Sequence, residues 1–163
     1  MGTIVVGVDG SAGSDAALRW AIAEAGLREA RLRVVHVHQL PQLPLGEAAL
    51  GAAGGMALPA VYSENGEELR KAVEVESRRL IDDALDRVGG ESAEALELER
   101  VIVDGPPAPA LIEAAKGAEL LVLGSRGRGG FLGLLLGSVT QQCVHHPPCP
   151  VVVLPPQEER GEG

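Results

Sequence analysis

The stretch LLVLGSRGRGGFLGLLLGSVT (residues 120–140) begins as a buried strand and continues into a glycine-rich loop. Leu120 to Leu123 is a continuous apolar run, typical of a strand covered on both faces of a parallel sheet. Glycines allow backbone N–H groups to converge on an anion without a Cβ in the way. Ser138 and Gln141 have the S-x-x-Q spacing of a capping box, which predicts a helix beginning at Gly137–Ser138. A strand, a glycine loop and a helix N-terminus together favour a phosphate-binding site.

The rest of the chain alternates strand-like and helix-like segments. Short apolar, β-branched runs predict strands, and apolar residues three or four positions apart predict helices. Strands are expected at residues 4–8, 32–38, 96–103, 120–123 and 151–154, and helices after Ser14 to about residue 30, at 67–88 and, more briefly, at 111–115. This alternation predicts βαβ crossovers, and therefore an α/β fold with an open five-stranded parallel sheet and helices on both faces.

The order of the strands bears on where a ligand would bind. If the winding reverses after the third strand, the first and fourth strands are neighbours and the order is 3-2-1-4-5. Ligands of open parallel sheets bind beyond the carboxyl ends of the strands at such a reversal. Asp9 ends the first strand and Gly124 ends the fourth. An acidic acceptor for ribose hydroxyls is therefore expected beside the glycine loop.

Composition and charge exclude several classes of protein. The chain has 163 residues, of which 45% are hydrophobic, and this length suits one domain over residues 1–156. A net charge of -9 and a single Trp, Tyr and Phe argue against nucleic-acid binding. Glycines and prolines interrupt the uncharged residues 131–157 too often for a membrane span. No signal peptide is visible and two cysteines are too few for a disulfide framework, so we expect a cytoplasmic protein.

Two segments depart from the alternation of strands and helices. Residues 39–66 are rich in glycine, alanine and proline, and a mobile insertion is expected there. Residues 157–163 are acidic and lack an apolar anchor, which predicts a flexible tail.

The glycine loop does not match two common nucleotide-binding motifs. It lacks the G-x-x-x-x-G-K-[ST] pattern of a P-loop, and Leu132 occupies the last glycine position of the dinucleotide pattern G-x-G-x-x-G. Its spacing is instead Gly124-x2-Gly127-x9-Gly137-Ser138. This spacing resembles the nucleotide-binding signature of the universal stress protein family, G-x2-G-x9-G-[S/T].

The resemblance to that family extends over most of the chain. It includes VVGVDGS (residues 5–11), GSRGRGGF (residues 124–131) and HHPPCPVVV (residues 145–153). It implies a fold of the adenine nucleotide alpha-hydrolase type, related to half of a Rossmann fold. It also implies an ATP site and a homodimer that pairs through Val151–Leu154. We expect Mg²⁺ to bind through the phosphates, because the cation offsets phosphate charge on an acidic chain.

The resemblance further assigns parts of the nucleotide to residues of this chain. It implies that Asp9 lies at the adenosine end and that Val37 provides a backbone contact for adenine. The implied phosphate cradle consists of Gly124, Arg126, Gly127, Gly137, Ser138 and Thr140. The complete expected nucleotide-binding set is Val8, Asp9, Val37, Leu123, Gly124, Arg126, Gly127, Gly130, Gly137, Ser138, Val139 and Thr140.

Plainer interpretations of several residues stay open at this point. Asp9 could shape only a turn or cap a helix, and Arg126 could be a solvated side chain. His36 and His38 could be structural histidines. A further cluster has the residue types of metal ligands: Cys143, His145, His146 and Cys149. The spacing of Cys143 also suits packing in the core.

The resemblance therefore implies an ATP-binding regulator of the stress response, a nucleotide-dependent switch. One alternative is a slow ATPase or phosphotransferase, and another is an interaction scaffold that binds AMP or cyclic AMP. The loop has no carboxylate, histidine or lysine to position a nucleophile, so any hydrolysis is expected to run at about one turnover per second or less. The sequence does not identify a downstream protein partner.

Overall fold

Five parallel strands form one sheet in the order β3-β2-β1-β4-β5. The strands are β1 (Thr3–Gly7), β2 (Arg31–His38), β3 (Leu98–Asp104), β4 (Leu120–Gly124) and β5 (Val151–Leu154). The computed structural model describes residues 1–39, 65–127 and 135–155. The predicted α/β class, parallel pairing and strand order are confirmed.

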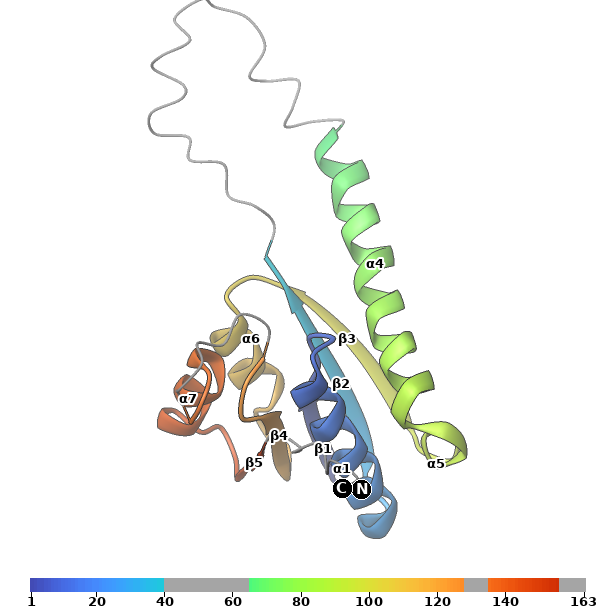
Figure 1. Cartoon of the computed structure of the whole chain (residues 1–163), viewed down its shortest axis with the longest axis vertical. Coiled ribbons are helices and arrows are strands. Elements are labelled where there is room, and N and C mark those ends of the chain that lie inside the picture. Colours follow the sequence, from blue (N-terminus) through green and yellow to red (C-terminus); the bar gives the residue numbers. More distant parts are fainter. Residues whose placement is uncertain (40–64, 128–134, 156–163) are drawn as a thin grey trace, which may run out of the picture.

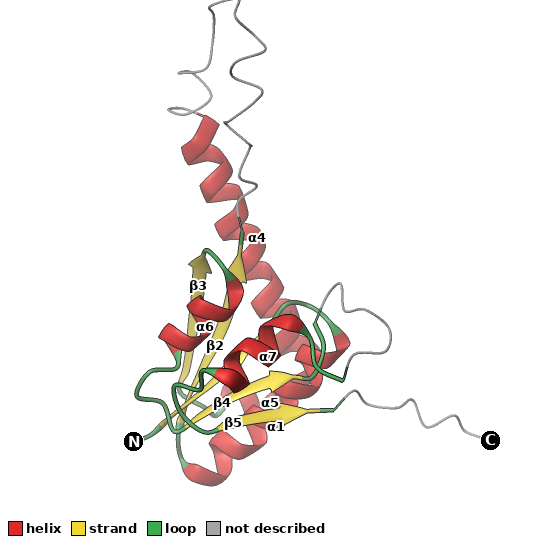
Figure 2. Cartoon of the chain, turned by 90° about the vertical axis from the view of Figure 1, so that its left-hand side faces the viewer, coloured by secondary structure: helices red, strands yellow, loops and turns green. Residues whose placement is uncertain are grey.

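Helices cover both faces of the sheet, as the alternation predicts (Figures 1 and 2). One face packs against α1 (Ala12–Arg28), α4 (Asn65–Val88) and α5 (Gly90–Glu94), and the other against α6 (Pro107–Ala114) and α7 (Ser138–His145). Successive strand residues point to opposite faces. Ile4 and Val34 therefore pack in the cluster with α1 and α4, whereas Val5 and Val35 pack in the cluster with α6 and α7.

Helix α1 begins earlier than the sequence pattern predicts. We expected the helix to follow Ser14, but it starts at Ala12, and Ser11 is its N-cap. The Ser11 hydroxyl accepts a hydrogen bond from the backbone N–H of Ser14 at 3.2 Å. Ser14 is itself buried, and its hydroxyl donates to the Ser11 carbonyl at 3.0 Å. Two serines three residues apart offer the same capping chemistry, and the fold uses the first.

The other boundaries differ by only a few residues. Helix α4 ends at Val88, directly before the glycine pair that was expected to stop it, and Gly90 then begins the short helix α5. Most of the predicted insertion lies outside the described residues, in 40–64, and so does the predicted tail, 157–163. Within the described parts of the chain, no helix has both the length and the apolar character needed to cross a membrane.

Candidate functional site

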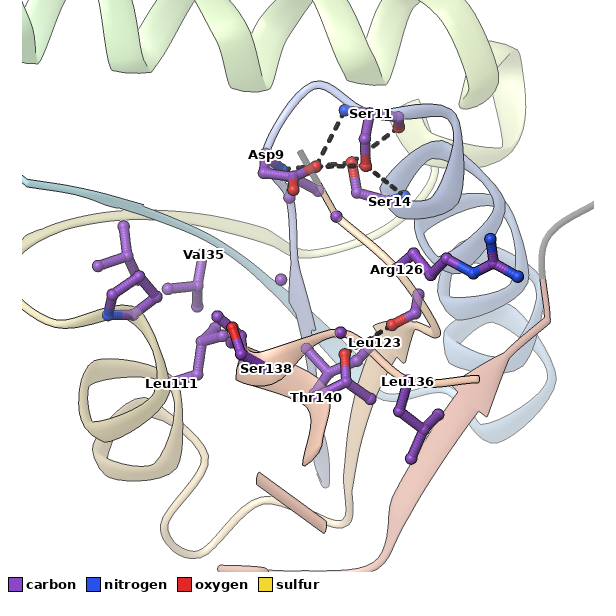
Figure 3. Close-up of a pocket in the computed structure, with 18 residues that line it drawn as sticks. Asp9, Ser11, Ser14, Val35, Leu111, Leu123, Arg126, Leu136, Ser138 and Thr140 are labelled. Atoms are coloured by element: carbon purple, nitrogen blue, oxygen red, sulfur yellow. Dashed lines mark hydrogen bonds between the residues drawn. The ribbon is translucent and has the colours of Figure 1, made fainter. Parts of the chain in front are cut away.

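A pocket of about 310 Å³ lies at the carboxyl ends of β1 and β4, where the winding of the sheet reverses (Figure 3). Its volume is at the lower end of the range typical of small-molecule sites. Every expected site residue except Gly130 lines it: Val8, Asp9, Val37, Leu123, Gly124, Arg126, Gly127, Gly137, Ser138, Val139 and Thr140. Gly130 lies outside the described residues. Residues spread from the first strand to the last helix therefore converge on one hollow.

Part of the pocket lining was not predicted from the sequence. The residues not anticipated are Gly7, Ser11, Ser14, Val35, Pro107, Leu111 and Leu136. Val35 could have been found, because it lies two residues before Val37 on the same face of β2. Leu111 and Pro107 come from α6, and nothing in their local sequence indicates that this helix reaches the pocket. These apolar side chains form a wall that suits a flat, weakly polar group.

Asp9 takes part in the turn that leads into α1. Its Oδ1 accepts hydrogen bonds from the Ser11 backbone N–H, at 2.9 Å, and from the Ser11 hydroxyl. The Asp9 N–H in turn donates to the Ser14 hydroxyl at 3.3 Å. The turn-forming interpretation of Asp9 is therefore correct for Oδ1. The other carboxylate oxygen, Oδ2, is the atom that a side chain on Gly127 would strike, so it faces the glycine loop.

Gly124 has a packing role that the motif did not reveal. A methyl group on Gly124 would lie 2.7 Å from the carbonyl carbon and oxygen of Gly13, in the first turn of α1. Backbone atoms cannot yield as a flexible side chain can, so only glycine lets the end of β4 lie this close to α1. The lack of a side chain at Gly124 thus serves helix packing, whatever else its backbone contacts.

Helix α7 begins where the sequence predicts, but it is capped differently. Its N-cap is Gly137, with extended backbone and no side-chain cap bond, and Ser138 is the first helical residue. The expected capping box is therefore wrong. Ser138 is exposed and lines the pocket. The first backbone N–H groups of a helix lack intrahelical acceptors, so this end of the pocket offers donors to an anion.

Thr140 is buried and already hydrogen-bonded. Its hydroxyl donates to the Gly124 carbonyl at 2.8 Å, and the residue is only 5% exposed. This bond ties α7 to the end of β4 below the glycine loop (Figure 3). The Thr140 proton is used by the protein, so the oxygen can offer a ligand only acceptor capacity.

Arg126 contributes its backbone to the pocket more than its charge. In Figure 3 its guanidinium extends away from the side of the pocket that holds Asp9, Ser138 and Thr140. Its Nε is buried without a hydrogen-bond partner among the described residues. The expected pairing of this side chain with phosphates would require it to turn.

The remaining titratable candidates have structural surroundings. His36 Nδ1 lies 2.8 Å from the Val8 carbonyl oxygen, as expected of a structural histidine. Cys143 is fully buried in the core beside α6, and burial raises the pKa of its thiol to about 11. Burial also raises the pKa of Cys149. No cluster of three metal-ligating side chains occurs among residues 1–39, 65–127 and 135–155.

A second hollow lies on the other face of the sheet, between α4 and the carboxyl ends of β2 and β3. This charged groove has a volume of about 480 Å³ and is lined by His38, Arg70, Glu74, Arg78, Arg100, Ile102 and Asp104. Several of its charges are paired: Arg78 with Glu74 at 3.5 Å, and Arg100 with Asp82 at 2.7 Å. None of the expected site residues lies in it.

The chain is similar to curated proteins that are about twice its length. A universal stress protein of Mycolicibacterium smegmatis is 34% identical over 151 residues, which cover 93% of this chain and 47% of the relative. The chain thus spans about half the length of the curated relatives it matches.

Solved structures share the fold. A universal stress protein in complex with cAMP has a TM-score of 0.60 and 26% identity, and the match covers 94% of this chain and 95% of that one. The protein MJ0577 has a TM-score of 0.71 at 20% identity, with 97% and 98% of the two chains covered. The sequence profile of the universal stress protein family matches residues 1–155. The chain therefore belongs to the universal stress protein family.

Proposed function

We propose that this chain binds ATP together with Mg²⁺ and acts in the cytoplasm as a nucleotide-dependent regulator of the stress response. The observation that carries the proposal is the convergence of the expected nucleotide-binding residues on one pocket at the reversal of the sheet. Proteins with open parallel sheets bind their ligands at this position.

The two ends of the pocket suit the two ends of a nucleotide. Val35, Val37 and Leu111 offer an apolar surface to a base, and the start of α7 offers backbone N–H groups to phosphates. Gly127 lets the loop lie against the Asp9 carboxylate, because a Cβ there would collide with Oδ2. The structural neighbour in complex with cAMP supports an adenine nucleotide as the ligand.

Mg²⁺ fits this donor set only as a partner of the phosphates. Asp9 is the one carboxylate among the described residues that line the pocket, and its Oδ1 is held by Ser11. When bound, the ion would neutralise phosphate charge in a protein with a net charge of -9. The protein's part is to hold the nucleotide through backbone donors.

A regulatory role suits the pocket better than rapid catalysis. The described residues that line it include neither lysine nor histidine, and its one arginine directs its guanidinium away from Ser138 and Thr140. Phosphoryl transfer needs a positioned nucleophile and stabilisation of the developing charge. We therefore expect turnover of ATP at or below about one per second.

Calorimetric titration tests the proposed ligand. Purified chain is titrated with ATP, AMP and cyclic AMP, each with and without Mg²⁺, and with GTP as the control for the base. We expect one site per chain, the tightest binding for ATP with Mg²⁺, and weaker binding of GTP. Tighter binding of AMP or cyclic AMP would favour the scaffold alternative, and the absence of binding by every nucleotide would refute the proposal.

A further inference from the structure

The first turn of α1 and the turn that leads into it contact the start of the glycine loop at two points. At the first, a Cβ on Gly13 would overlap the carbonyl oxygen of Arg126, and a Cβ on Gly124 would lie 2.7 Å from the backbone of Gly13. At the second, Oδ2 of Asp9 lies against Gly127. Residues 124–127 therefore lie directly on this turn, with no side chain of Gly13 or Gly124 between the two backbones.

The turn itself is tied together by hydrogen bonds. Ser11 donates to Asp9, Ser14 donates its N–H to Ser11, and Asp9 donates its N–H to Ser14. These bonds fix the position of Asp9 and of the backbone that carries Gly13. The turn is thus a rigid support, and a displacement forced at its contact with the loop would move the loop.

The contact at Gly13 involves the peptide unit that carries the N–H of Gly127, a residue that lines the pocket. The carbonyl of Arg126 and the N–H of Gly127 belong to one planar trans peptide unit, so they point in opposite directions. The oxygen faces Gly13, whereas the nitrogen of Gly127 lies on the side of Gly137, 3.7 Å from where a Cβ on that residue would be. Pushing the oxygen away from α1 therefore moves the Gly127 N–H toward the start of α7.

We propose that Gly13 is a positioning residue for the phosphate end of the pocket. Because Gly13 has no side chain, the Arg126–Gly127 peptide can lie close to α1, and in that position the Gly127 N–H can point at a phosphate. This inference rests on the proposed binding of ATP. A side chain at position 13 would displace the loop that follows Gly124, the last residue of β4. It would not move the apolar wall formed by Val35 and Val37.

The test compares Gly13→Ala with Gly26→Ala, a matched substitution in the same helix. A Cβ on Gly26 meets nothing within 4 Å, and alanine favours the helix at both positions. Binding of ATP with Mg²⁺ and of adenosine is measured by NMR titration. We expect Gly13→Ala to weaken ATP about tenfold or more while adenosine changes by less than about twofold. Gly26→Ala should leave both affinities unchanged.

Three results would overturn the proposal. The first is wild-type affinity for ATP in a folded Gly13→Ala variant, and the second is an equal loss for ATP and adenosine, which would indicate general damage. In both cases the proposed function survives, because the unaltered chain still binds ATP. The third is a wild-type chain that binds neither ligand, which refutes the proposed function and this inference with it.

A measurement on the unaltered chain decides the matter if Gly13→Ala does not fold. The backbone amide signals of Gly13 and Gly26 are followed during titration with ATP and, separately, with adenosine. We expect the Gly13 signal to shift with ATP and to stay in place with adenosine, while the Gly26 signal stays in place with both. A Gly13 signal that does not respond to ATP at saturation would contradict the proposed coupling.

Discussion

The pocket and the charged groove both open at the carboxyl edge of the sheet, yet their chemistry differs. Val37 lines the pocket on one face of β2, and the next residue, His38, lines the groove on the other face. The pocket combines apolar walls with backbone donors and one carboxylate. The groove is walled by long side chains, among them Arg70, Arg78 and Arg100. One hollow therefore has donors fixed by the fold, and the other has charges on flexible stems.

This difference favours the pocket over the groove as the proposed nucleotide site. Two arginines of the groove are already paired with carboxylates, so a ligand would have to compete with the Arg78–Glu74 and Arg100–Asp82 pairs. It would also have to order long side chains, which costs conformational entropy on binding. Backbone donors at the start of α7 are already ordered, so an anion bound there would not incur that cost.

The two edges of the sheet repeat the contrast. β5, on the side of the pocket, reads Val-Val-Val-Leu and carries no charge. β3, on the side of the groove, carries Glu99, Arg100 and Asp104, and Glu99 pairs with Arg33 at 2.8 Å. Charged residues protect an edge strand from pairing with another chain, whereas an uncharged apolar edge invites it.

The largest effect is expected from Gly127→Val, which should abolish ATP binding. A Cβ at this position collides with Oδ2 of Asp9, and the branched side chain would extend into the space proposed for phosphate. Calorimetry with ATP and Mg²⁺ measures the loss. Gly26→Val, at an exposed position with open space around it, serves as the control. Unchanged affinity in a folded Gly127→Val variant would show that the glycine loop does not hold the nucleotide.

The second prediction concerns the edges: the chain forms a homodimer through β5, and Val152→Glu weakens it. A charge on each copy of an apolar edge strand disfavours pairing of the two strands. Light scattering at micromolar concentration measures the mass before and after substitution. Val75→Glu, at a 67% exposed position on α4, is the control and should leave the mass unchanged. A monomeric wild-type chain at these concentrations would contradict the prediction.

A smaller effect is expected on stability, where the hydroxyls of Thr140 and Ser138 should differ. Thr140→Val removes the bond to the Gly124 carbonyl and leaves that acceptor unpaired, so the free energy of unfolding should fall by about 1–2 kcal/mol. Ser138→Ala removes an exposed hydroxyl and should change stability by less than about 0.5 kcal/mol. Urea denaturation measures both. Equal losses in the two variants would mean that Thr140 is not the internal tie between α7 and β4.

The sequence predicts the fold well because the signals for it are local and repeated. Alternating apolar runs and helical periods indicate a parallel sheet, and the glycine spacing places the pocket at the ends of β1 and β4. Asp9 and Gly124 were correctly expected side by side, since parallel strands end at the same edge of the sheet.

Contacts between distant residues were beyond the sequence pattern. The need for glycine at position 13 comes from the Arg126 carbonyl, more than a hundred residues away, and no local signal encodes it. The direction of the Arg126 side chain and the hydrogen bond of Thr140 likewise depend on neighbours that only the folded chain supplies. The choice between Ser11 and Ser14 as the cap of α1 is of the same kind.

The smallest effect is expected in the groove: Arg78→Gln should leave the affinity for ATP within about twofold of wild type at physiological salt. Arg78 is an exposed side chain paired with Glu74, on the face of the sheet opposite Val37. At this ionic strength the field of an exposed charge is largely screened beyond about 8 Å. Calorimetry at physiological and at low salt measures the effect, and a small loss confined to low salt would fit a purely electrostatic influence. A loss of more than about twofold at both salts would mean that the groove and the pocket act together, and the contrast between them would no longer hold.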